Sequence, residues 1–206
     1  ILGKGKFGKV YVATCDSTRA EFNALPREVA IKYFKQADTD NAWTKECSVM
    51  ELLQLRLRSV GQPNYIPEYF GSIKAKGKMY TIMEWVKGET LSKFTKTRHG
   101  DSEKIAITCE IARGIHQLHE AGLAHRDLKP ANIIVRPGNR TVKIIDFGVS
   151  CIQGNIGECN LPVGTSLYMD PKLFPTQEEF KSHAAQNYPV IDHSLLKRSD
   201  WWAFGI

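Results

Sequence analysis

The sequence lacks cysteine motifs, dense basic runs and long apolar stretches. Its five cysteines are an odd number without a Cys-x-x-Cys pair, which argues against a disulfide framework and a zinc site. We therefore expect reduced thiols, in the cytoplasm or the nucleus. Cys151 and Cys159 are interpreted as ordinary thiols, with redox sensitivity as the alternative. No apolar run approaches the roughly 20 residues that cross a bilayer, and this stretch holds no secretory signal.

A chain of 206 residues that is 42% hydrophobic and 24% charged is typical of one globular domain or two small lobes. Its formal net charge is +6, but the Lys and Arg residues are scattered. We therefore favour a solvated surface over a nucleic-acid interface. The chain begins at Ile1 inside a strand-like stretch and ends at Ile206 near a helix start, so we expect a piece of a longer protein.

Residue patterns divide the chain into a strand-rich part, residues 1–86, and a mostly helical part, residues 87–206, joined at residues 84–88. In the first part, β-forming stretches lie at 1–2, 10–13, 29–34 and 79–83. A helix is predicted over residues 43–58, because apolar side chains recur at helical spacing at Val49, Leu52, Leu53 and Leu57.

The helical part contains one long predicted helix, capped by Asp101 or Ser102 and followed by Gly122. Its apolar positions recur on one face, at Ala106, Cys109, Ala112, Ile115 and Leu118. Two short apolar strands follow at 133–135 and 142–145, separated by a Pro-Gly turn. A β lobe joined to an α lobe is the expected architecture.

Glycines near the start form a G-x-G-x-x-G-x-V pattern made of Gly3, Gly5, Gly8 and Val10. Glycine lets backbone N–H groups approach phosphate oxygens, because no Cβ stands in the way. A dinucleotide-binding fold shares this pattern, but it requires a helix directly afterwards and an acid about twenty residues further on. Because residues 10–13 continue as a strand, a loop that covers a triphosphate explains the glycines better.

Lys32 lies in the apolar strand 29–34. Taken alone, Lys32 could equally be a lysine that faces solvent. Its distance in sequence from the glycine loop, however, favours contact with nucleotide phosphates. An acid on the following helix would orient it. Glu46 is our choice, because the apolar positions after it then face inward, and Glu51 is the alternative.

The sequence His-Arg-Asp-Leu-Lys-Pro-Ala-Asn at 125–132, followed by Asp-Phe-Gly at 146–148, is the most informative part of the chain. It combines an acid, a lysine, an amide and a second acid, which are the groups needed for phosphoryl transfer. Asp127 can orient and deprotonate a hydroxyl, and Lys129 can face the transferred phosphate. Asn132 and Asp146 can bind Mg²⁺.

On these motifs the whole chain resembles a eukaryotic-type protein kinase catalytic domain. The resemblance implies a bilobal α+β fold, with an antiparallel β lobe and one main helix at 1–86. The mostly helical lobe at 87–206 would be truncated at the helix of residues 200–202. ATP and Mg²⁺ are implied between the lobes, with Lys32 on the α- and β-phosphates.

The resemblance assigns adenine recognition to residues 83–86. Met83 would be the gatekeeper, and the main chain of Glu84 and Val86 would contact the base. Glu89 would reach the ribose, with a plain exposed acid as the alternative. Apolar side chains would enclose the adenine, namely Leu2, Val10, Ala30 and Ile134.

Two features resemble the kinases that modify Ser or Thr. These enzymes usually carry Leu-Lys-x-x-Asn after the aspartate, as at 128–132, whereas tyrosine-directed ones carry Ala-Ala-Arg or Arg-Ala-Ala. Residues 164–169 resemble the substrate-positioning loop, in which Thr165 would hydrogen-bond Asp127 and Lys129. The implied partners are ATP and protein substrates with a Ser or Thr acceptor, without nucleic acid and without a membrane segment in this fragment. The oligomeric state stays unknown.

The chain departs from the family pattern in two places. Asp-Pro-Lys at 170–172 replaces Ala-Pro-Glu. In the family this glutamate forms a buried pair with an arginine, which Lys172 would repel. We therefore expect either that the pair is absent or that the segment follows another course. Arg126 usually meets an activation-loop phosphate, but residues 151–164 contain no Ser, Thr or Tyr. Glu158 is our candidate substitute for that phosphate.

Residues 173–199 form a longer stretch than usual before the Asp-Trp-Trp signature at 200–202. We interpret them as an insertion that binds substrate or a partner, or as a loop without a role. Asp200 would anchor the main chain around His125 and Arg126. Because more helices follow in the family, residues 1–206 alone are expected to fold poorly.

Other functions stay open as alternatives. A pseudokinase scaffold is disfavoured because the chain retains Lys32, Asp127, Asn132 and Asp146, although the change at Lys172 keeps it in consideration. A small-molecule kinase shares the two acids but seldom the Gly-Thr-x-x-Tyr stretch. A nucleic-acid-binding module has neither a basic stripe nor interleaved aromatics to support it.

Overall fold

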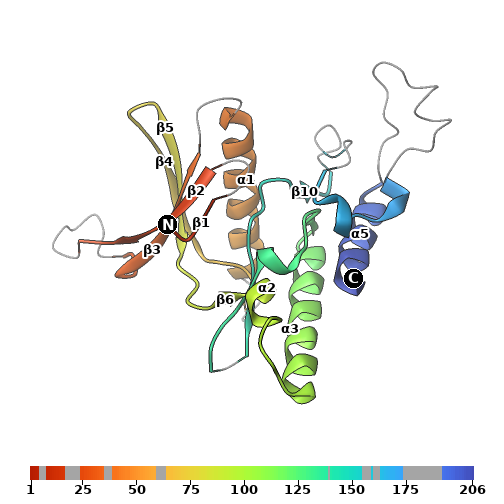
Figure 1. Cartoon of the computed structure of the whole chain (residues 1–206). Helices are drawn as coiled ribbons and strands as arrows, with labels where there is room; N and C mark the ends of the chain where they lie inside the picture. Colours follow the sequence, from red (N-terminus) through yellow and green to blue (C-terminus); the bar gives the residue numbers. More distant parts are fainter. Residues whose placement is uncertain are drawn as a thin grey trace.

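The computed structural model describes residues 1–4, 8–16, 24–34, 39–58, 64–138, 140–154, 159, 163–173 and 192–206. Figure 1 shows a β-sheet with helix α1 on one side of the molecule and helices α3 and α5 on the other. The predicted α+β fold, with the β-rich part first, is confirmed. Gly5, Glu158 and residues 174–191 lie outside the described residues. The predicted roles of Gly5 and Glu158 and the predicted insertion therefore stay predictions.

The N-terminal sheet is antiparallel, and its described strands follow the order β1-β2-β3-β5-β4. Their bounds are Gly3–Lys4 for β1, Gly8–Thr14 for β2, Glu28–Phe34 for β3, Tyr69–Ala75 for β4 and Lys78–Glu84 for β5. Strands β2, β3 and β5 confirm the strands predicted at 10–13, 29–34 and 79–83, whereas the strand predicted at 1–2 is wrong, because the first strand is β1 at Gly3–Lys4. The sequence prediction missed β4, because Gly71 interrupts its apolar pattern where the register shifts.

Helix α1, Thr39–Arg58, packs against β4 and β5. It begins ahead of residue 43, where the prediction placed its start. Its buried residues recur at helical spacing, as predicted, and include Glu46, Val49, Met50 and Leu53. One acid of this helix is therefore buried on the same face as the apolar core.

Helix α3, Asp101–Glu120, has the predicted bounds, but its cap and part of its buried face differ from the prediction. Gly100 is the N-cap and no side chain caps the helix, so the predicted caps Asp101 and Ser102 are wrong. Its buried face consists of Ile107, Ile111, Gly114, Ile115, Leu118 and His119. The predicted face is wrong in its first half, because Cys109 is exposed and the bulkier isoleucines occupy the core. Gly122 ends the helix with φ of 72°, as predicted.

The helical part carries short strands that position its loops. Strands β6 Glu89–Thr90, β8 Ile133–Val135 and β9 Val142–Ile144 form one sheet, and β7 Leu123–Ala124 pairs with β10 Cys151–Ile152. The helix α2 Leu91–Phe94 follows β6, and short 3₁₀ turns lie at η2 Pro130–Asn132, η4 Ser166–Tyr168 and η5 Pro171–Leu173. The predicted strands at 133–135 and 142–145 are confirmed.

Helix α5, His193–Gly205, begins well before the predicted residue 200, with Asp192 as its N-cap. One apolar cluster joins α1, α3 and the β8–β9 hairpin, through Leu53, Ile115 and Ile144 among others. The loops between these elements therefore start and end on a common core. None of the described helices is long and apolar enough to cross a membrane.

Cys151 and Cys159 form a disulfide, with their Cα atoms 5.7 Å apart, so the expectation of reduced thiols is wrong for this pair. Cys15, Cys47 and Cys109 are free. Both bonded cysteines are buried in an apolar cluster with Ala124, Met169, Leu173 and Leu196. The odd number of cysteines did not indicate this bond, because the pairing depends on both cysteines lying in the same cluster of the folded chain.

The α3 core predicts a contrast between two isoleucines of one helix. Ile115 is 1% exposed and Ile105 is 63% exposed. Ile115→Ala should lower the free energy of unfolding by about 2–5 kcal/mol, because it leaves a cavity, whereas Ile105→Ala should change it by less than about 0.5 kcal/mol. Urea unfolding of the complete protein measures both, and equal losses would contradict the packing of α3.

The disulfide predicts the number of thiols that react with an alkylating reagent. In the denatured protein prepared without reductant, three of the five cysteines of this chain should be modified, namely Cys15, Cys47 and Cys109. After reduction all five should react. Mass spectrometry of the peptides that contain Cys151 and Cys159 reads the result, and complete modification before reduction would show that the bond does not form.

Candidate active site

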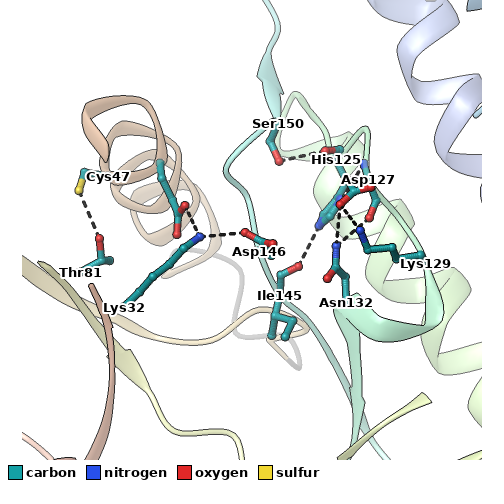
Figure 2. A network of polar contacts seen from close by, with 11 residues as sticks. Lys32, Cys47, Thr81, His125, Asp127, Lys129, Asn132, Ile145, Asp146 and Ser150 are labelled. Carbon is teal, nitrogen blue, oxygen red and sulfur yellow. Dashed lines mark hydrogen bonds and ion pairs between the residues drawn. The ribbon is translucent and has the colours of Figure 1, made fainter. Parts of the chain in front are cut away.

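Lys32 on β3 is a buried cation between two acids. Its Nζ lies 2.5 Å from Oε2 of Glu46 on α1 and 2.8 Å from Oδ1 of Asp146. Figure 2 shows Lys32 reaching from the sheet toward Asp146. Glu51, the alternative partner, is exposed and accepts a bond from the Tyr69 hydroxyl at 3.4 Å. The geometry therefore selects Glu46 as the acid that holds Lys32.

The three charges shift one another's pKa values. Burial acts to lower the pKa of Lys32, but the two carboxylates prevail and raise it above its ordinary value. Burial raises the pKa of Glu46, and Lys32 opposes that shift. Burial also acts to raise the pKa of Asp146, yet Lys32 prevails and lowers it. Asp146 is therefore ionised at neutral pH and available to a cation.

Asp127 is the centre of a second cluster, which Figure 2 shows beside Asp146. Its Oδ2 accepts bonds from Lys129 Nζ at 2.7 Å and Asn132 Nδ2 at 3.1 Å, and its Oδ1 accepts a bond from Thr165 Oγ1 at 2.7 Å. Lys129 Nζ also donates to Thr165 Oγ1 at 2.8 Å. The predicted bonds of Thr165 to Asp127 and Lys129 are confirmed.

Asp200 on α5 holds the loop that carries Asp127. Its carboxylate is 1% exposed and accepts bonds from the backbone N–H groups of His125 and Arg126, each at 2.8 Å. This confirms the predicted anchor. Such a hold is needed because Arg126 adopts φ of 70°, which side-chain-bearing residues rarely do. His119 Nε2 lies 2.9 Å from the same carboxylate, a contact that no sequence pattern indicated.

The buried loop residues also connect to the Asp146 segment. His125 Nε2 lies 3.1 Å from the carbonyl oxygen of Ile145, the residue before Asp146. Asp146 itself has φ of 70°. Burial lowers the pKa of Arg126 to about 10, against the opposing effect of Asp200, so the guanidinium stays charged at neutral pH.

Gly164 and Asp170 determine the course of the segment that carries Thr165. Gly164 has φ of 135°, and an added Cβ would lie 2.4 Å from the carbonyl oxygen of Arg126. Asp170 is 3% exposed and accepts bonds from Lys172 N at 2.9 Å and Arg198 Nε at 3.3 Å. The Lys172 side chain is exposed, which avoids the repulsion between buried cations. No family pattern pointed to Asp170 as an anchor.

The residues predicted to surround adenine lie on β2, β3, β5 and β8 and just before β1. Ala30 is paired with Met83 across β3 and β5, and Leu2 N donates to Val10 O at 2.8 Å. Ala30 and Val86 are buried, Ile134 is half-buried, and Leu2 and Glu89 are exposed.

Gly8 has a packing role, because a Cβ added there would lie 1.9 Å from Tyr33 O. At Gly3, by contrast, no atom lies within 4 Å of an added Cβ.

Asn132 and Asp146 present oxygen ligands that fit Mg²⁺. Asn132 Nδ2 donates to Asp127 O at 2.9 Å, so its Oδ1 faces away from Asp127. Within the described part of the chain, no group of three or more His, Cys, Asp or Glu side chains could hold a metal. Two oxygen ligands suit a cation that takes most of its ligands from phosphates and water, as Mg²⁺ does.

Comparison with known proteins gives the family. A profile of the protein kinase domain matches residues 1–206. All of the chain aligns with mitogen-activated protein kinase kinase 7 of Arabidopsis thaliana, at 32% identity over 212 residues and 60% of that protein. All of it also aligns with a probable serine/threonine-protein kinase of Dictyostelium discoideum, at 29% identity over 217 residues and 44% of that protein.

An Aurora kinase of Eremothecium gossypii is 28% identical over 198 residues, which cover 95% of this chain and 51% of that protein. The chain therefore belongs to the protein kinase family, which confirms the resemblance inferred from its motifs. It spans about half the length of these relatives, between 44% and 60%.

Proposed function

We propose that the chain is the catalytic domain of an ATP-dependent protein kinase that transfers the γ-phosphoryl group of ATP, with Mg²⁺, to Ser or Thr hydroxyls of proteins. Its two lobes would be residues 1–86 and 87–206. The observation that carries the proposal is the hydrogen-bonded cluster of Asp127, Lys129 and Thr165, because its members supply an acceptor for a hydroxyl proton and a cation beside it.

In the proposed reaction, Asp127 accepts a hydrogen bond from the acceptor hydroxyl and aims its oxygen at the γ-phosphorus. The new P–O bond forms as the bond to the oxygen bridging the β- and γ-phosphorus atoms breaks. ADP leaves, and the hydroxyl proton passes to Asp127. Lys129, whose Nζ lies 2.7 Å from the Asp127 carboxylate, offsets charge on the transferred group.

Lys32 contacts the α- and β-phosphates in this proposal, and Glu46 holds it in place. Asn132 and Asp146 hold Mg²⁺, which neutralises charge on the phosphate oxygens when bound. The adenine ring lies among Leu2, Val10, Ala30 and Ile134, beside the gatekeeper Met83 and the main chain of Glu84 and Val86. Glu89 contacts the ribose, and Gly3, Gly5 and Gly8 border the phosphates.

Two findings support Ser or Thr as the acceptor. Thr165 contacts both Asp127 and Lys129, as in the substrate-positioning loop that its sequence resembles. The Dictyostelium discoideum relative is described as a probable serine/threonine-protein kinase. Both point to the same class of substrate.

Phosphate transfer by the complete protein tests the proposal directly. The protein should phosphorylate Ser and Thr in a peptide array with Mg²⁺ and ATP. Asp127→Asn and Asp146→Asn should each lower kcat by about 100-fold or more, because they remove the hydroxyl acceptor and a metal ligand. Asp101→Asn on α3, where the side chain is 90% exposed, is the control. Binding of ATP without transfer would indicate a pseudokinase, and preference for an aminoglycoside or a sugar would indicate a small-molecule kinase.

Two acids of helix α1 give a matched comparison. Glu46→Gln should lower kcat/KM for ATP by about tenfold or more, equivalent to about 1.4 kcal/mol, because Lys32 loses the charge that orients it. Glu51→Gln, on the exposed face of the helix, should stay within about twofold. Initial rates at varied ATP concentration measure the difference. Equal effects of the two substitutions would show that the Lys32–Glu46 pair does not orient the lysine.

A further inference from the structure

We propose that the carboxylate of Glu84 is a positioning residue that fixes the adenine-contacting main chain to the β8–β9 hairpin. The inference rests on the proposed function, which assigns only the main chain of Glu84 to the nucleotide. Glu84 ends strand β5, at the point where the sheet passes into the connection between the two parts of the chain. Its side chain turns to the other part.

The Glu84 carboxylate has three partners. Arg136 forms an ion pair with Oε1. Oε2 lies 3.0 Å from Lys143 Nζ and accepts a bond from the Glu68 backbone N–H at 3.2 Å. The Glu84 N–H in turn donates to Glu68 O at 2.7 Å. Side chain and main chain of Glu84 are thus both held, and the orientation of its peptide groups is fixed from two sides.

The two cations belong to the β8–β9 hairpin. Arg136 directly follows β8, and Lys143 lies within β9, where it is paired with Ile134. Asn132 directly precedes β8, and Asp146 follows shortly after β9. The hairpin that Glu84 contacts therefore holds one candidate adenine contact, Ile134, and is flanked by both candidate Mg²⁺ ligands. Glu84 sets the spacing between the adenine end and the phosphate end of the site.

Burial makes the loss of one partner of this contact more costly than it is in a surface ion pair. The side chains of Lys143 and Glu84 are only 10% and 20% exposed. Burial lowers the pKa of Lys143, and the bond to Glu84 opposes the shift. Lys143 Nζ also donates to Ile66 O at 2.7 Å, so it is fixed in place rather than free to follow Glu84. Charges that are shielded from water are less screened than exposed ones.

A neighbouring ion pair supplies the control. Lys87, three residues after Glu84, lies 2.7 Å from Glu28 on β3, and their side chains are 66% and 37% exposed. This pair is solvated and does not involve the β8–β9 hairpin. It should contribute little, as exposed pairs usually do.

The test compares Glu84→Gln with Glu28→Gln in the complete protein. Glu84→Gln keeps the main chain and the side-chain shape but removes the charge. It should raise about tenfold both the KM for ATP and the Kd for a non-hydrolysable ATP analogue with Mg²⁺, while the KM for the peptide substrate stays within about twofold. Glu28→Gln should leave all three within about twofold. Arg136→Met combined with Glu84→Gln should be less than additive in the Kd, because the two residues act as one unit.

Several results would overturn the inference. These are equal effects of the two glutamine substitutions, additive effects of Glu84→Gln and Arg136→Met, or a parallel rise in the KM values for ATP and peptide, which indicates general loosening. Failure of the proposed function would look different. A wild-type protein that binds the analogue but transfers no phosphate would refute kinase activity, and the Kd values would still decide the role of Glu84. A wild-type protein that binds no analogue would overturn both.

Discussion

The arrangement of the site depends on compensating the charge of the buried Lys32 ammonium. A buried cation is tolerated only when opposite charges compensate it, and Lys32 finds them on a helix and on a distant loop. Strand β3, helix α1 and the segment after β9 must therefore stay in register with one another. Removing one partner of such a buried pair costs about 3–5 kcal/mol in other proteins, so the electrostatic requirement is also a structural one.

From Asp146 a series of buried polar contacts continues to α5. The carbonyl of Ile145 meets the His125 ring, and the backbone around His125 is held by Asp200. Among the described residues, His193 Nε2 is the one buried side-chain nitrogen or oxygen without a hydrogen-bond partner. The buried polar side-chain atoms of the described site residues therefore all have partners in the protein, which keeps these side chains in one arrangement. The same principle extends to Glu84, whose partners join the sheet to the β8–β9 hairpin.

Short contiguous motifs made most of the candidate site predictable from the sequence. Residues 125–132 and 146–148 form contiguous motifs, so Asp127, Lys129, Asn132 and Asp146 could be named as candidates without coordinates. Strands β3 and β5 were equally predictable, because β-forming residues fill positions 29–34 and 79–83. The kinase family then followed from several independent motifs rather than from one.

What could not be predicted depends on contacts between distant residues. Strand β4 is interrupted by Gly71, and the true face of α3 is set by which side chains are bulky enough to fill the core. The bond between Cys151 and Cys159 and the ion pairs of Glu84 join positions whose local sequences carry no signal. Local patterns reveal which element a residue occupies, but not which side chain will face it across the fold.

The left-handed backbone of Asp146 sets a steric cost against an electrostatic gain at a single position. Glycine adopts a φ of 70° without the steric penalty that an aspartate incurs. Replacing Asp146 by glycine would therefore relieve the backbone strain, but it would also remove a charge that compensates the buried Lys32. The ion pair between Asp146 and Lys32 is thus the contact that offsets the steric cost of placing a side chain at this left-handed position.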